Sequence, residues 1–326
     1  MLTSLMLAAL SLMPSQATRV DSVASQPITL KTATGDIYGS LVVPPGSGTH
    51  PVVLIIAGSG PTDRDGNSPI AVVPGKPLHP DTYKLLASAL AADGIASVRY
   101  DKRGIAASAA AMAGHAESEY RFDTGIDDAV AWINMLRVDP RFSKVIIVGH
   151  SEGSLVGMVA AQRAKADGFV SLEGAGRPAA AVLREQLTER GVPIAMFGAI
   201  LDSLSAGKTV DSTPPALAAL FRPSVQPYLI SWFHYDPAAE LRKLPYTTLV
   251  VQGTHDIQIT PSDAKLLASA PGAKLLTVDG MTHVLKIGPA DVNAQVAGVY
   301  TDGSVPLPPE LTTAIAAYVR AAPRSR

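Results

Sequence analysis

A serine between two glycines lies near the middle of the chain, in a pattern typical of nucleophilic serines. Residues 149–153 read GHSEG, which fits G-x-S-x-G and places Ser151 at the centre. The pattern follows an apolar stretch over 144–148 that predicts a strand, and it precedes a helical pattern that begins near Ser154. A sharp strand-to-helix turn lifts a serine hydroxyl out of a sheet, and the helix N-terminus favours negative charge beside it. Ser151 is therefore the candidate nucleophile, and a tight turn that serves packing alone is the alternative.

A serine hydroxyl needs a base, and three histidines follow Ser151 along the chain: His234, His255 and His283. His283 lies in a short loop directly after a predicted strand over 274–278, at the same edge of the sheet as the serine. His234 falls in a predicted insertion, and His255 is expected to be a structural neighbour. The chain order serine, acid, histidine then favours His283 as the base.

An acidic residue should orient this histidine and stabilise its charged form. Asp256 follows the predicted strand over 247–251, so it also lies past the carboxyl end of a strand. Asp263 falls inside a predicted helix, whereas Asp279 is close in sequence to His283 and is the stronger rival. We predict that Asp256 is the acid.

Negative charge that develops on a substrate carbonyl oxygen needs backbone N–H donors. One donor should be the amide after the nucleophile, that of Glu152. The second should come from the loop over 57–61 (AGSGP), where we predict Ser59, with Gly58 or Gly60 as alternatives. A glycine-rich loop without a catalytic donor is the other interpretation.

Alternating strands and helices must position these residues. A mostly parallel sheet with helices on both faces, an α/β architecture, is the arrangement that such an alternation predicts. Predicted strands cover 28–32, 37–43, 52–57, 95–100, 144–148, 169–172, 247–251 and 274–278, and predicted helices cover 81–93, 123–137, 154–165, 261–270 and 310–320.

Residues 175–243 separate two predicted strands by far more chain than a crossover requires. Their helical patterns predict a helical cap inserted into a core formed by 18–174 and 244–326. Large apolar side chains of the cap could line an acyl pocket or form the cap's own core: Met196, Phe197, Leu201, Phe221, Tyr228, Trp232, Phe233 and Tyr235.

The N-terminus resembles a secretory signal. An apolar run over 2–13 precedes Pro14, and small residues predict cleavage after Ala17, so 1–17 is the predicted signal peptide, although it lacks Lys and Arg before the apolar run. The run is too short to span a bilayer, so no stable membrane insertion is expected after its removal. We expect an exported protein, periplasmic or secreted; otherwise the protein is cytoplasmic.

Composition excludes several classes of function. The 326 residues carry a net charge of −1 and no cysteine, which excludes disulfides, thiolate metal sites and a cysteine nucleophile and gives no sign of nucleic-acid binding. Dinucleotide, phosphate-loop and H-E-x-x-H patterns are absent from the sequence, so we expect neither cofactor nor metal. The oligomeric state stays open.

Five segments in the right order carry a resemblance to a known family: 58–67 (GSGPTDRDGN), 99–104 (RYDKRG), 149–153 (GHSEG), 253–256 (GTHD) and 282–283 (TH). The chain resembles the α/β-hydrolase superfamily and, more narrowly, bacterial esterases related to the serine aminopeptidase S33 and dienelactone-hydrolase-like groups. The resemblance implies the α/β-hydrolase fold and ester hydrolysis through an acyl-enzyme. The charged residues 63–65 are expected to fix the oxyanion loop, with Arg103 as a possible partner.

The sequence thus predicts a serine esterase acting on small to medium uncharged esters, because the cap has no cluster of basic residues. The alternatives on the same triad are an aminopeptidase or amidase and a thioesterase. For a peptidase, Glu173, Asp202 and Glu240 are candidates to hold a substrate amine. A non-catalytic binding protein with this fold is the alternative from another class.

Overall fold

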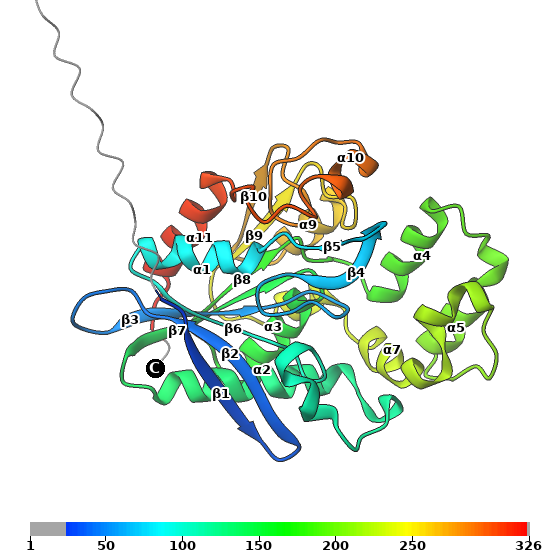
Figure 1. Ribbon diagram of the computed structural model, residues 1–326, viewed down its shortest axis with the longest axis horizontal. Coiled ribbons are helices and arrows are strands. Elements are labelled where there is room, and N and C mark those ends of the chain that lie inside the picture. Colours follow the sequence, from blue (N-terminus) through cyan, green and yellow to red (C-terminus); the bar gives the residue numbers. More distant parts are fainter. Residues whose placement is uncertain (1–23, 325–326) are drawn as a thin grey trace, which may run out of the picture.

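The computed structural model describes residues 24–324, so the predicted signal peptide over 1–17 lies outside the described residues. An eight-stranded sheet runs through the molecule in the order β1-β2-β6-β3-β7-β8-β9-β10 (Figure 1). The strands are β1 (Gln26–Thr32), β2 (Gly35–Val42), β3 (His50–Ile56), β6 (Ala96–Tyr100), β7 (Phe142–His150), β8 (Gly168–Leu172), β9 (Thr248–Gly253) and β10 (Ala273–Val278).

The six strands from β6 to β10 in this order pair in parallel, whereas β1 and β2 pair antiparallel at one edge. The prediction of a mostly parallel sheet is therefore confirmed. Because all six parallel strands point the same way, the loops that follow them meet at one edge of the sheet.

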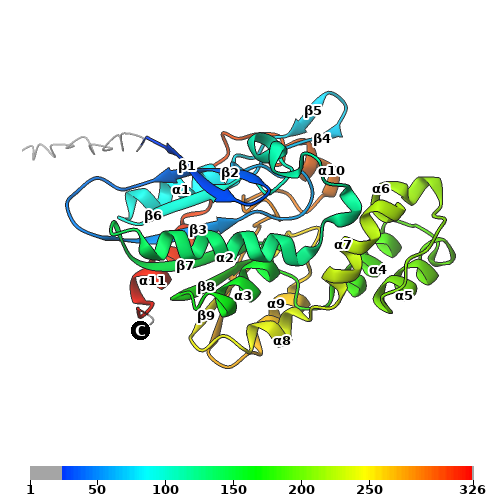
Figure 2. The same cartoon turned by 90° about the horizontal axis from the view of Figure 1, so that it is seen from below.

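Helices cover both faces of the sheet, as Figure 2 shows most clearly for α2 and α3 on one side. The helices of the core are α1 (Thr82–Ala92), α2 (Phe122–Val138), α3 (Glu152–Arg163), α9 (Pro261–Ala268), α10 (Val292–Ala297) and α11 (Pro309–Ala321), with 3₁₀ turns η1 (Ala106–Met112) and η2 (Glu117–Glu119).

Side chains of β3 alternate between the two layers of core that these helices close. Val52, Leu54 and Ile56 pack into a core that contains residues of α2 and α3, whereas Val53 and Ile55 pack into the core of α1 and α11. All five are almost completely buried. A continuous apolar strand is required here because neither face of β3 meets water.

The segment between β8 and β9 is helical and stands to one side of the sheet (Figure 2). It holds α4 (Ala179–Glu189), α5 (Gly198–Ser205), α6 (Ala218–Phe221), α7 (Gln226–Phe233) and α8 (Pro237–Leu241), with 3₁₀ turns η3 (Ile194–Met196), η4 (Pro215–Leu217) and η5 (Pro223–Val225). We call residues 175–243 the cap. The cap has an apolar core of its own, centred on Phe197, Leu201 and Phe221, none of which is exposed.

Several short elements were not predicted from the sequence. A small antiparallel hairpin, β4 (Ser68–Val73) and β5 (Lys76–Leu78), occupies part of the expected loop over 58–80, and it contacts α10 in the expected loop over 288–309. Within the described residues, no helix is both long and apolar enough to cross a membrane.

Candidate active site

Ser151 occupies a strained turn between β7 and α3. Its backbone has φ 55° and ψ −122°, a conformation that side-chain-bearing residues rarely adopt. A Cβ on Gly149 would lie 2.3 Å from the carbonyl oxygen of Gly153, and a Cβ on Gly153 would lie 2.3 Å from that of Ile56. The glycines at both positions are therefore a steric requirement of the turn, which also moves the start of α3 to Glu152, two residues before the predicted start.

Asp256 and His283 meet at the carboxyl edge of the sheet. Asp256 Oδ2 lies 2.8 Å from His283 Nδ1, and both side chains are buried. Asp256 Oδ1 accepts hydrogen bonds from the amides of Gln258 (2.7 Å) and Ile259 (3.0 Å). Burial opposes ionisation of Asp256, but the charge of His283 and hydrogen bonds from His283 and Glu173 outweigh it and lower its pKa to about 2. Asp256 is thus held as a carboxylate that faces the histidine.

The two rival acids are engaged elsewhere. Asp279 is exposed and accepts a hydrogen bond from Thr254 Oγ1 at 3.0 Å. Asp263 is buried in α9 and forms an ion pair with Arg177 at 2.7 Å.

The serine and the histidine are not hydrogen-bonded to each other in the structure. Among the described residues, no hydrogen bond joins the Ser151 hydroxyl to His283, whereas Asp256 already binds the other ring nitrogen. Catalytic hydrogen bonds are often long in free enzymes and form when substrate is bound, so this geometry is compatible with a base role.

A chain of hydrogen bonds ends at the backbone carbonyl oxygen of His283 and holds this residue in place. The amide of Gly58 donates to Tyr83 Oη (3.1 Å), Tyr83 Oη lies 2.7 Å from His150 Nδ1, and His150 Nε2 lies 2.7 Å from the carbonyl oxygen of His283. Burial first, and then the nearby charge of His283, lower the pKa of His150 to about 3. A neutral His150 has one N–H, so the chain must run from Gly58 through Tyr83 to His150 and on to His283.

Sequence reasoning missed Tyr83 and His150. The position of His150 directly before Ser151 was a signal, but nothing in the spacing of Tyr83 links it to this motif. Tyr83 lies in the first turn of α1 and His150 at the end of β7, so their contact depends on the tertiary fold.

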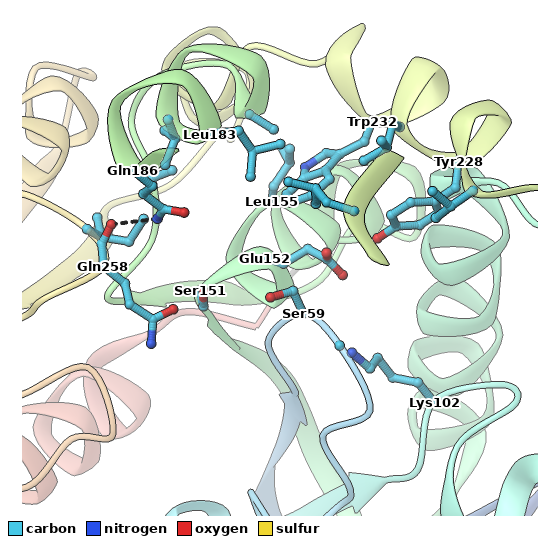
Figure 3. Close-up of a pocket in the computed structure, with 18 of the residues that line it drawn as sticks. Ser59, Lys102, Ser151, Glu152, Leu155, Leu183, Gln186, Tyr228, Trp232 and Gln258 are labelled. Carbon is cyan, nitrogen blue, oxygen red and sulfur yellow. Dashed lines mark hydrogen bonds between the residues drawn. The ribbon is translucent and has the colours of Figure 1, made fainter. Parts of the chain in front are cut away.

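The backbone amides predicted as oxyanion donors are available to bind a substrate oxygen. In the part of the chain that the structure describes, the amides of Ser59 and Glu152 donate to no protein acceptor. The amide of Gly58 is used by Tyr83, which leaves Ser59 and Gly60 of the three candidates in the loop. Figure 3 shows Ser59, Ser151 and Glu152 around one cavity.

Two ion pairs fix the loop that carries Ser59. Arg64 pairs with Asp101 at 2.6 Å, and Asp65 pairs with Arg99 at 2.7 Å. Both partners belong to the end of β6 and the loop after it, so Arg64 and Asp65 tie the oxyanion loop to the neighbouring strand. Asp63 instead accepts hydrogen bonds from the amides of Asp65 and Asn67 within the loop.

Arg103 is not a partner of this loop, contrary to the expectation. Its guanidinium forms a buried ion pair with Asp128 of α2 at 2.6 Å and also contacts Thr32 and Thr34. The bend of the chain after β6 turns Arg103 toward α2 and the β1–β2 turn, away from the oxyanion loop.

A cavity of about 470 Å³ opens in front of Ser151, between the core and the cap (Figure 3). Its apolar wall includes Leu155 of α3, Leu183 of α4, and Tyr228 and Trp232 of α7. By contrast, Phe197 belongs to the cap's own core. The large apolar residues of the cap therefore divide between the two expected roles.

One end of the cavity is polar. Burial raises the pKa of Glu152 and lowers that of Lys102, and the two opposite charges stabilise each other. Lys102 Nζ also donates to the carbonyl oxygen of Gly58, and Tyr228 is hydrogen-bonded to Glu152. Figure 3 shows these side chains on the same side of the cavity. The pair presents no net charge to a substrate.

The three acids considered as amine-binding groups are placed otherwise. Asp202 pairs with Arg184 at 2.5 Å and Glu240 pairs with Lys243 at 2.7 Å. Glu173 is completely buried beside Asp256. No group of three or more metal-binding side chains lies within residues 24–324.

Comparison with known proteins finds similar serine hydrolases. The family model described as serine aminopeptidase, S33, matches residues 67–203, which include Ser151. Esterase EstD of Thermotoga maritima is 28% identical over 264 residues, which are 77% of this chain. The alignment covers 58% of that protein, so the chain spans less than two thirds of its length.

Solved structures share the fold at low sequence identity. Est1E from Butyrivibrio proteoclasticus, solved with ferulic acid bound, has a TM-score of 0.57 and 14% identity over 90% of this chain and 98% of its own. Proline iminopeptidase from Mycobacterium smegmatis has a TM-score of 0.58 and 14% identity over 90% of this chain and 98% of its own. These likenesses show the fold, and the resemblance stated from the five sequence segments is confirmed. With its parallel sheet and the turn at Ser151, the chain has the α/β-hydrolase fold and is similar to the esterase and hydrolases named above.

Proposed function

We propose that this protein is a serine hydrolase that cleaves carboxylic esters through an acyl-enzyme on Ser151. The observation that carries the proposal is the buried 2.8 Å contact between Asp256 and His283, at the sheet edge where the turn after β7 presents Ser151. The similarity to Esterase EstD supports an ester as the substrate.

The reaction follows from the geometry of these groups. His283 takes the proton of Ser151 as its hydroxyl attacks the ester carbonyl, and Asp256 stabilises the imidazolium. The amides of Ser59 and Glu152 stabilise the tetrahedral oxyanion, each by about 3 kcal/mol. His283 then protonates the departing alcohol, and a water activated by the same histidine releases the acid.

The cavity indicates the class of ester. Its walls are mostly apolar, and each charged side chain of the lining has an opposite charge beside it. Lys102 and Glu152 stabilise each other, Arg103 pairs with Asp128, Glu117 with Arg222, and Arg177 with Glu185 and Asp263. An anionic or cationic acyl group would therefore be desolvated without a free counter-charge. Small to medium uncharged acyl chains fit this environment best.

The purified protein should hydrolyse p-nitrophenyl esters of short and medium acyl chains. Ser151→Ala should lower kcat by more than about 10⁴-fold, because the nucleophile is lost. A fluorophosphonate probe should label the wild type and not the variant. Labelling that persists in Ser151→Ala would place the nucleophile elsewhere, and a wild type that is neither labelled nor active would indicate a binding protein.

An aminopeptidase is the second candidate, favoured by the match to the S33 family and by the carboxylate of Glu152 in the cavity. Because Lys102 neutralises Glu152, we expect aminoacyl p-nitroanilides to be turned over at least tenfold less efficiently than the esters. The opposite ranking would favour this candidate, and turnover of acyl thioesters above both would favour a thioesterase.

We also propose that the protein is exported, on the strength of the apolar segment over 2–13 and the small residues before Ala17. Mature protein recovered outside the cytoplasm should begin at Thr18. Recovery of the full-length chain from the cytoplasm would contradict export.

A further inference from the structure

A second carboxyl group lies beside the candidate catalytic acid. Glu173 directly follows β8, and β8 is the neighbour of β9, the strand that leads to Asp256. The amide of Glu173 donates to the carbonyl oxygen of Val251 in β9 at 3.0 Å, which fixes this residue against the end of that strand. Its backbone has φ 48°, and its side chain has no exposed surface. The topology therefore brings two carboxyl groups together in the interior.

The oxygens of Glu173 are satisfied unequally. Oε1 accepts a hydrogen bond from the amide of Gly253 at 2.8 Å. Oε2 is buried and finds no donor among the described residues. As a carboxylate, this oxygen would be an unpaired buried acceptor next to another negative charge, which is a costly arrangement. As a carboxylic acid, the same oxygen becomes a donor that can bind Asp256.

The division of the proton follows from the partners of the two acids. Asp256 accepts two backbone amides and faces His283, so it is the better place for the negative charge. Burial first, and then the charge of Asp256, raise the pKa of Glu173 well above its ordinary value. Two adjacent carboxyl groups in one buried site share a single ionisation in this way.

We propose that Glu173 is protonated and donates a hydrogen bond to Asp256, which makes it a positioning residue of the catalytic acid. This role rests on the proposed function of Asp256. The donor holds the carboxylate toward His283 and withdraws part of its negative charge, so that Asp256 does not bind the imidazolium too tightly.

The other titratable groups around this pair do not supply a competing charge. Burial raises the pKa of Tyr300, and burial lowers that of His150 to about 3, so both are neutral near pH 7. Glu173 therefore faces one charged carboxylate, Asp256, and through it the candidate base, His283.

Two variants test whether Glu173 acts as a protonated hydrogen-bond donor or as a carboxylate. Glu173→Gln keeps an N–H donor toward Asp256 and an oxygen for the Gly253 amide, whereas Glu173→Leu keeps neither. We expect kcat of Glu173→Gln within about threefold of wild type and that of Glu173→Leu at least tenfold lower, with KM within about twofold in both.

The pH profile of kcat/KM gives a readout that a merely structural role would not move. In Glu173→Leu, Asp256 keeps its full charge toward His283, so the acid limb should move up by about half a pH unit or more. In Glu173→Gln it should stay in place. If Glu173 were ionised, its removal would take away a negative charge, and the acid limb of both variants would move to lower pH; that result would overturn the proposal.

An infrared difference spectrum tests the proton without activity. Wild type minus Glu173→Gln at pH 7 should show the C=O band of a protonated carboxyl group, and a carboxylate band alone would overturn the proposal. This spectrum needs no substrate. A wild type without esterase activity would therefore refute the proposed function, while the spectrum would still show whether Glu173 is protonated.

Discussion

At the scale of single residues, Asp256 is held by two backbone amides in addition to His283. Two amides fix Oδ1, and His283 lies 2.8 Å from Oδ2. This arrangement determines both the charge and the direction of the carboxylate. The nitrogen of an amide at the same position would instead donate toward the ring and favour the wrong tautomer of His283.

Asp256→Asn should therefore reduce kcat by about 10⁴-fold while the fold stays intact. Asp279→Asn is the matched control, because Asp279 is exposed and close to His283 in sequence but bonded to Thr254. Steady-state kinetics on a p-nitrophenyl ester, with circular dichroism of each variant, measure both. A large loss in Asp279→Asn and a small one in Asp256→Asn would exchange their roles.

The positions of Ser151, Asp256 and His283 could be predicted because each follows a strand whose apolar residues are visible in the sequence, buried in β7 and β9 and at the sheet edge in β10. The groups that support them could not. Glu173 also follows a strand, but its environment depends on which strands are neighbours in the sheet. Tyr83 reaches His150 from a helix 67 residues earlier in the chain, and no local spacing records that contact.

At the scale of elements, the close approach of α3 to β3 requires a residue without a side chain at the start of α3. Gly153 lies in the first turn of α3, and the closest atoms to its missing Cβ are backbone oxygens of Ile56 and Ala57. Backbone cannot move aside in the way that a flexible side chain can.

Gly153→Ala should lower the free energy of unfolding by more than about 4 kcal/mol or prevent folding. Gly125→Ala is the control: it lies within α2, where the added methyl meets only Tyr120 Oη at 3.5 Å. That change should instead stabilise the protein by about 0.5–1 kcal/mol, because alanine favours a helix. Urea unfolding measures both, and a stable Gly153→Ala variant would mean that α3 can shift.

Strands with continuous apolar runs and helices with clear periodicity were predicted within a few residues. The β4–β5 hairpin and α10 were not, since β5 has only three residues and α10 only six. Such short elements depend on contact with each other and have little pattern of their own.

At the scale of the whole molecule, the cap and the core build the substrate cavity together. The core supplies Ser59, Ser151 and Glu152, while the cap supplies Leu183 and Trp232 (Figure 3). In the proposed esterase, cap side chains that do not take part in the chemistry would therefore limit the length of the acyl chain.

Leu183→Trp should shorten the accepted acyl chain, because the larger side chain fills the cavity. We expect kcat/KM for p-nitrophenyl octanoate to fall at least tenfold relative to that for the acetate. Ile194→Trp, at a cap residue that is 57% exposed, should leave this ratio unchanged. An equal loss on both esters in Leu183→Trp would show that the acyl chain lies elsewhere.

The cap leaves the core after β8 and returns before β9, two strands that are adjacent in the sheet. Its ends thus rest on neighbouring strands, so an insert of another length can be accommodated there without a change in strand order. Two bonds must survive such an exchange: Arg177 binds Asp263, and Gln186 donates to the carbonyl oxygen of Gln258, two residues after Asp256 (Figure 3). Chains with other substrate ranges could accordingly be made by replacing residues 190–236 and keeping α4 and α8, because α8 packs against α3 and α9 of the core.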